Sequence, residues 1–148
     1  MKFLITLLIA SFSCRSAYKT EQGNIDCESI KNEFVSTDFV SSDDKKAIPK
    51  KILRKLKKVD FEIVNPNESF NKTDMAGGIN KRLIICGLNK SQTLGFIYYE
   101  EGGVGIQRIC LIYKILDRQT IFKYIGLWAN IKSVDDLKLD IKRGICYN

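Results

Sequence analysis

Three carboxylates stand where a pair of them could perform acid–base chemistry. Glu68 and Asp74 lie in a long polar segment, residues 65–80, and Glu100 lies beside a Gly-rich turn. Glycoside hydrolysis uses two carboxyl groups held several ångströms apart across a cleft. Adjacent Glu100 and Glu101 would point to opposite faces of a strand, so the pair would have to be Glu100 with Glu68 or Asp74. The alternative is that these acids are solvated at turns, and the sequence favours it.

The chain contains no histidine. This absence removes Ser–His and Cys–His nucleophilic pairs, histidine acid–base catalysis and most zinc and haem sites. No C-x-x-C pair and no Gly-rich phosphate loop are present either. We therefore expect no metal site and no cofactor, and the sequence leans against an enzyme without deciding the matter.

Composition describes one basic globular domain. The chain has 148 residues, of which 45% are hydrophobic, and a formal net charge of +7. That is enough apolar material for a real core. Lysines outnumber arginines and are not interleaved with aromatic residues, which is unlike nucleic-acid readers. No nucleic-acid partner is expected.

The second half of the chain has the composition of β-strands. Segments rich in Ile, Phe and Tyr, joined by short turns, occupy residues 82–88, 93–99, 106–116 and 119–128. A shorter alternating segment at 61–64 also reads as a strand. Consecutive strands with short connections predict an antiparallel meander. Alternation in the third segment predicts one face covered by helices and one partly wet.

Helical patterns flank these strands. The clearest spans residues 47–59, with an inward stripe of Ile48, Ile52, Leu53, Leu56 and Val59. Its lysines, at 50, 51, 55, 57 and 58, could lie on an anionic membrane or form a solvated face; the second interpretation is favoured, and they should be dispensable for folding. Residues 27–40 give a weak helical signal.

The last helix is predicted over residues 133–144. Ser133 is its N-cap, Asp136 is the reciprocal acid, and Gly144 ends it. The predicted fold class is α+β: a four- to five-stranded antiparallel meander sheet, with an amphipathic helix before it and a capped helix after it.

The N-terminus has the layout of a secretory signal peptide. Lys2 precedes an apolar run over residues 3–10, and the small residues Ser11 and Ser13 stand at −3 and −1 of a cut before Cys14. Residues 1–16 resemble the signal of a bacterial lipoprotein, although that family usually has Leu at −3. The resemblance implies a lipid on Cys14 and a membrane partner through it; the alternative is a free secreted protein.

These signals divide the chain into a signal peptide (1–13), a tether (14–26) and a single α+β domain (27–148). The stretches "FEIVNPNESFNKTD" and "FIYYEEGGVG" resemble parts of an uncharacterised exported bacterial family, which implies no activity. We expect an exported, lipid-anchored envelope protein that binds an unknown protein or ligand without catalysis. The alternative is a carboxylate-dependent hydrolase, for example on glycans, using the 65–80 loop and the 100–101 turn. A third possibility is a basic surface module that binds anionic polymer through residues 45–58.

Five cysteines are present, so lipidation of Cys14 would leave an even set for an oxidising compartment. In a meander, Cys86 and Cys110 lie two strands apart, about 9.5 Å, which is too far for a disulfide. We expect a Cys27–Cys146 disulfide, with Cys86 and Cys110 as buried thiols. The alternative is a crossed set in which each terminal cysteine joins one strand.

Overall fold

The computed structural model describes residues 27–73, 77–116, 119–127, 131–143 and 145–147, with the backbone alone at 119, 121–127 and 145–147. The predicted signal peptide and tether, residues 1–26, lie outside the described residues, and so do Cys14 and Asp74.

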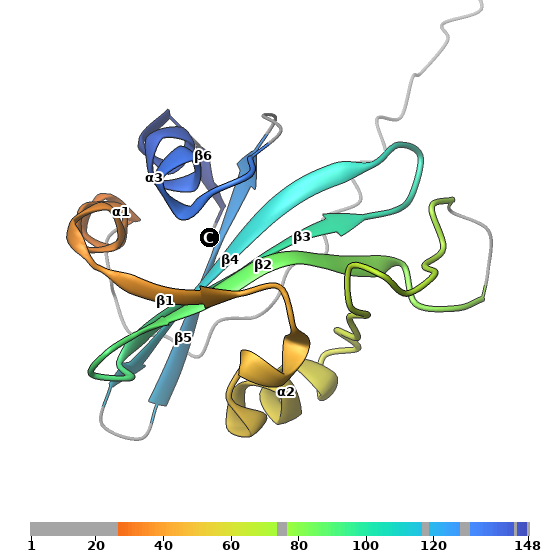
Figure 1. Ribbon diagram of the computed structural model, residues 1–148, viewed down its shortest axis with the longest axis horizontal. Helices are drawn as coiled ribbons and strands as arrows, with labels where there is room; N and C mark the ends of the chain where they lie inside the picture. The colour runs from red at the N-terminus through yellow and green to blue at the C-terminus, as the bar shows by residue number, and fades with distance from the viewer. Residues whose placement is uncertain (1–26, 74–76, 117–118, 128–130, 144, 148) are drawn as a thin grey trace, which may run out of the picture.

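Within the described part of the chain, six strands form one antiparallel sheet whose order follows the sequence (Figure 1). The strands are β1 (Phe39–Ser42), β2 (Lys81–Asn89), β3 (Leu94–Glu101), β4 (Gln107–Leu116), β5 (Gln119–Leu127) and β6 (Ile145–Tyr147). The predicted α+β class and meander order are confirmed. Strands β2 to β5 occupy the four predicted segments.

The sheet has more strands than the predicted four to five, because two short edge strands complete it. β1 pairs with the end of β2, from Phe39 opposite Asn89 to Ser42 opposite Cys86. β6 pairs with β5 on the other edge. The prediction of a strand at 61–64 was wrong, because that segment makes only a single parallel bridge, between Val64 and Arg82.

Two helices cover one face of the sheet (Figure 1): α1 (Cys27–Ser36) and α3 (Val134–Arg143). The predicted N-cap of α3 is confirmed. The Ser133 hydroxyl accepts the Asp136 backbone N–H at 3.1 Å and donates to the Asp136 carboxylate at 2.8 Å. This exchange satisfies one of the amides that a helix leaves unpaired at its start.

The opposite face carries a 3₁₀ turn, η1 (Lys45–Ala47), and the basic helix α2 (Lys50–Lys57). Asp44 caps η1 by accepting the Lys46 N–H at 2.9 Å. Pro49 is the N-cap of α2, and the helix begins at Lys50. The helix is therefore shorter than the predicted 47–59.

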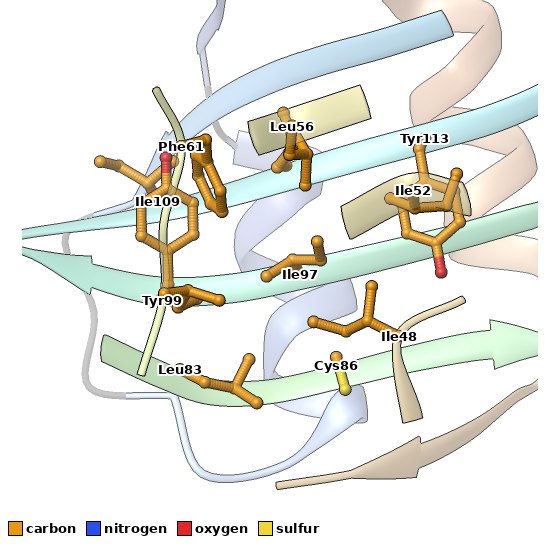
Figure 2. Close-up of a cluster of buried hydrophobic side chains, with 12 residues drawn as sticks. Ile48, Ile52, Leu56, Phe61, Leu83, Cys86, Ile97, Tyr99, Ile109 and Tyr113 are labelled. Atoms are coloured by element: carbon orange, nitrogen blue, oxygen red, sulfur yellow. The ribbon is translucent and has the colours of Figure 1, made fainter. Parts of the chain in front are cut away.

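The inward stripe of α2 is confirmed except at its end. Ile48, Ile52 and Leu56 are buried against the sheet, as Figure 2 shows. Val59 is about half exposed, at 48%. The helix has ended before it, and Asp60, with a φ of 57°, turns the chain back toward the sheet.

Among the described residues, each face of the sheet carries a buried core, so the predicted partly wet face was wrong. Side chains alternate along β3, which is buried from Leu94 to Glu100. Leu94, Phe96 and Tyr98 join the cluster under α1 and α3, with Ile30, Phe34, Cys110, Ile112, Ile131, Leu137 and Ile141. Ile97 and Tyr99 join the cluster under α2, with Ile48, Ile52, Leu56, Phe61, Ile63, Leu83, Cys86, Ile109, Leu111 and Tyr113 (Figure 2).

Cys86 and Cys110 are free, buried thiols, as predicted. They belong to different clusters on opposite faces, and β3 separates their strands. Burial, with a smaller contribution from the nearby Asp44 and Asp43 carboxylates, raises the pKa of Cys86 to about 11, and burial also raises the pKa of Cys110. Both thiols are therefore protonated at neutral pH. Cys27 is disulfide-bonded, and its partner lies outside the described side chains.

Candidate functional site

Of the predicted carboxylate candidates, Glu68 lies in the 65–73 loop and Glu100 lies near the β3–β4 turn, at the end of the sheet where this loop meets the turn. The loop is folded on itself. Glu68 donates its backbone N–H to the Asn65 carbonyl at 3.0 Å, and the Glu68 carboxylate accepts the Asn65 N–H at 2.7 Å. The Asn71 amide donates to the Gly77 carbonyl at 2.7 Å and its oxygen accepts the Thr73 N–H at 3.0 Å. Local side-chain-to-backbone bonds therefore hold this loop in shape.

Gly102 fastens the loop to the turn. Its N–H donates to the Asn80 carbonyl at 2.8 Å, and the next N–H, from Gly103, donates to the Lys72 carbonyl at 3.3 Å. A Cβ at position 102 would lie 2.2 Å from the Asn71 carbonyl oxygen, which is a clash with backbone. Only glycine permits this approach, so the position of the loop depends on it.

Glu100 is buried between two arginines. One carboxylate oxygen accepts from Arg82 on β2 at 2.7 Å, and the other accepts from Arg108 on β4 at 3.3 Å. The three residues lie directly across from one another in the strand registers. Glu101 pairs instead with Lys81, at 2.8 Å, so the two acids have separate partners. Glu100 is therefore the centre of a cross-strand ion cluster.

Glu68 stands apart from this cluster. The Glu68 carboxylate is exposed, closes the Asn65 turn and lies 3.7 Å from the Lys45 ammonium. Asp74 falls outside the described residues.

A shallow hollow of about 270 Å³ opens over the loop. Its lining residues are Pro66, Asn67, Glu68, Ser69, Phe70, Lys72 and Arg82. The Arg82 guanidinium lies over the Phe70 ring, 4.4 Å from its centroid, a cation–π contact that fixes both side chains. Glu68 lines the hollow and Glu100 does not, because Arg82 stands between Glu100 and the loop. The described carboxylates therefore do not face each other across a cleft.

The chemistry that this hollow offers is recognition. Its lining includes two cations, an amide, a hydroxyl and one acid. Those groups suit an anionic or polar ligand better than proton transfer. Sequence reasoning missed Arg82 and Arg108, although Glu100 was singled out. The available signal was a basic residue on each strand flanking Glu100, but using it required the strand registers.

Other kinds of site are not found in the described part of the chain. No group of three or more His, Cys, Asp or Glu side chains there could hold a metal ion. None of the helices in those residues has the length and apolarity to cross a bilayer.

Comparison of the whole chain with protein-family models, curated proteins and solved structures found no match.

Proposed function

We propose that this protein is an exported envelope protein, anchored by a lipid on Cys14, that binds a ligand or protein without catalysing a reaction. The observation that supports binding without catalysis is the pairing of Glu100. Both of its oxygens are bound to arginines within one sheet, which suits a structural acid and deprives a hydrolase of its buried carboxylate. The hollow bearing Lys72 and Arg82 is the surface that we assign to the ligand, with an anionic group as the favoured feature.

The cysteines support the anchor. Cys86 and Cys110 are free and buried, and Cys27 is disulfide-bonded. Its partner is consequently Cys14 or Cys146, and we infer Cys146. Helices α1 and α3 pack in one core, and β6, which contains Cys146, follows α3 directly. That pairing leaves Cys14 as the single cysteine without a place in the domain. The sequence Ser11-Phe12-Ser13-Cys14 provides a cleavage site directly before Cys14. Cleavage there leaves Cys14 at the N-terminus, where its thiol can carry the lipid.

The anchor has a direct test. When the full chain is expressed in a bacterium that lipidates exported proteins, we expect the N-terminal peptide to begin at Cys14 and to carry a diacylglyceryl mass. Intact-mass and peptide analysis measure it, and a Cys14→Ser variant provides the unmodified reference. A wild-type mass matching a bare N-terminus at Cys14 or Tyr18 would refute the anchor.

The assignment of Glu100 is tested by stability. Glu100→Gln should lower the free energy of unfolding by about 1–3 kcal/mol, because two partly buried arginines lose a charged acceptor. Urea unfolding measures the change. Glu68→Gln, at an exposed turn, should change it by less than about 0.5 kcal/mol. Catalytic acids are often held at a cost in stability, so a variant at Glu100 that is as stable as the wild type, or more stable, would favour the hydrolase instead.

A further inference from the structure

The most concentrated charge on the described surface is on and before α2. Residues 45–58 contain eight basic residues and no acidic one. Arg54 is the centre of the solvent face of the helix. Its neighbours at three and four residues on either side are all lysines, namely Lys50, Lys51, Lys57 and Lys58, and all five side chains are exposed. Residues at this spacing lie on one face of a helix. We call these five residues the basic face.

This arrangement works against the helix that carries it. Like charges at three and four residues apart repel one another, and lysines in the first turn meet the positive end of the helix dipole. The first turn has no acidic residue, and the Pro49 cap makes no side-chain hydrogen bond. Within the described residues, Lys57 alone of the five has an ion pair, with Glu62 at 3.6 Å. No contact among the described residues explains the accumulation of charge.

The apolar side of α2 is fully used by the core, which defines how a partner could bind. Ile48, Ile52 and Leu56 are buried against the sheet (Figure 2). The helix therefore has no free hydrophobic stripe to insert into a bilayer. A partner on the solvent side of α2 meets mainly cations, and the chemistry that fits them is an extended anionic surface.

Three features favour lipid headgroups over nucleic acid. Four of the five residues are lysines, which bind phosphate as point charges, and residues 45–60 contain no aromatic side chain on which a base could stack. The third feature rests on the proposed anchor at Cys14. The thirteen residues from Cys14 to Cys27 span at most about 45 Å, which exceeds the diameter of a domain of this size.

A tether of that length keeps the domain at the membrane without fixing its orientation. Tethering also raises the local concentration of headgroups, so a weak electrostatic contact is enough to select one orientation. We propose that the basic face of α2 lies on the anionic headgroups of the membrane that holds the anchor, with α1 and α3 on the far side of the sheet.

The test removes the lipid so that the face is measured by itself. The mature chain from residue 14 with Cys14→Ser is sedimented with vesicles of seven parts phosphatidylcholine to three parts phosphatidylglycerol, and with phosphatidylcholine alone. Binding should require phosphatidylglycerol and fall steeply with added salt. Each basic residue strengthens such binding about fivefold, so the triple change Lys50→Glu, Arg54→Glu and Lys58→Glu should weaken it at least about 100-fold.

The matched control carries the same charge change elsewhere on the surface. Lys90→Glu, Lys132→Glu and Lys142→Glu are exposed positions outside α2 and should weaken binding only several-fold. Thermal melting should show both triple variants folded, because exposed charges contribute little to stability. Equal losses in the two variants, no binding by the parent, or tighter binding to single-stranded DNA than to vesicles would each overturn the proposal. An unmodified Cys14 in the mass measurement would refute only the lipid anchor, because the protein used in the vesicle assay carries no lipid.

Discussion

Phe96→Ala is expected to lower the free energy of unfolding by about 4 kcal/mol, within the range for deleting a buried aromatic ring. Phe96 is on the central strand β3 and is fully buried. Its ring makes edge contacts with Phe34 of α1 at 5.4 Å and Phe39 of β1 at 5.2 Å. It also covers Gly87 of β2, where an added Cβ would lie 2.4 Å from the ring. One side chain thus joins a helix, an edge strand and the sheet.

Equilibrium unfolding in urea measures the loss, with the midpoint falling and the slope unchanged if the fold survives. Val104→Ala is the matched control, because Val104 is 99% exposed at the tip of the β3–β4 turn and should shift stability by less than about 0.5 kcal/mol. A Phe96→Ala variant that unfolds at the wild-type midpoint would mean that this three-ring contact does not hold α1 to the sheet.

The central sheet could be predicted because its signals are local. Each of β2 to β5 is eight to ten residues of β-branched, aromatic and apolar side chains, bounded by turn residues. The edge strands carry no such signal. β1 has four residues and β6 has three, and both exist because a neighbouring strand offers unpaired backbone groups. Pairing of that kind is a tertiary effect that composition does not record.

The second covered face was missed for a related reason. Arg108 and Lys114 share a face of β4 with Cys110 and Ile112, which made that face read as half wet. Lys114 is in fact paired with Glu33 of α1, 81 residues away, and Arg108 with Glu100 of β3. The charges lie at the two ends of the strand and are satisfied there, while the apolar residues between them are buried. A sequence cannot show a partner at that separation.

In the candidate site, too, local features could be predicted from the sequence, whereas features that depend on tertiary contacts could not. Opposite orientations for Glu100 and Glu101 could be predicted from the strand period, and their separate ion partners agree with it. The role of Glu100 could not be predicted, because it depends on the strand registers that place Arg82 and Arg108 on either side of it. The anchoring of the 65–73 loop depends on Gly102, a residue that the sequence indicated only as part of a turn.

Cys27→Ser is expected to lower the free energy of unfolding by about 4–5 kcal/mol, the largest effect of a single thiol in this chain. A Cys27–Cys146 disulfide would close a loop of nearly the whole domain, and in the chain-entropy model a loop of that length contributes about that much by restricting the unfolded chain. Cys27 begins α1, whose Ile30 and Phe34 pack with Leu137 of α3. The bond would therefore hold together two helices that already share a core.

Stability is measured by urea unfolding with and without a reductant. The reductant should destabilise the wild type by as much as Cys27→Ser does, and it should leave the stability of the Cys27→Ser variant unchanged. Cys110→Ala supplies the contrast: it removes a buried thiol but keeps the disulfide, so the reductant should lower its stability by as much as it lowers that of the wild type. In native protein at pH 8, Cys86 and Cys110 should resist alkylation, because both are buried and the pKa of Cys86 is about 11.

Non-reducing peptide mapping then identifies the partner of Cys27. A Cys27–Cys146 peptide is the expected product, whereas a Cys14–Cys27 peptide would close a loop of only thirteen residues, predict a smaller loss of about 3 kcal/mol, and remove the free thiol on which the lipid anchor depends.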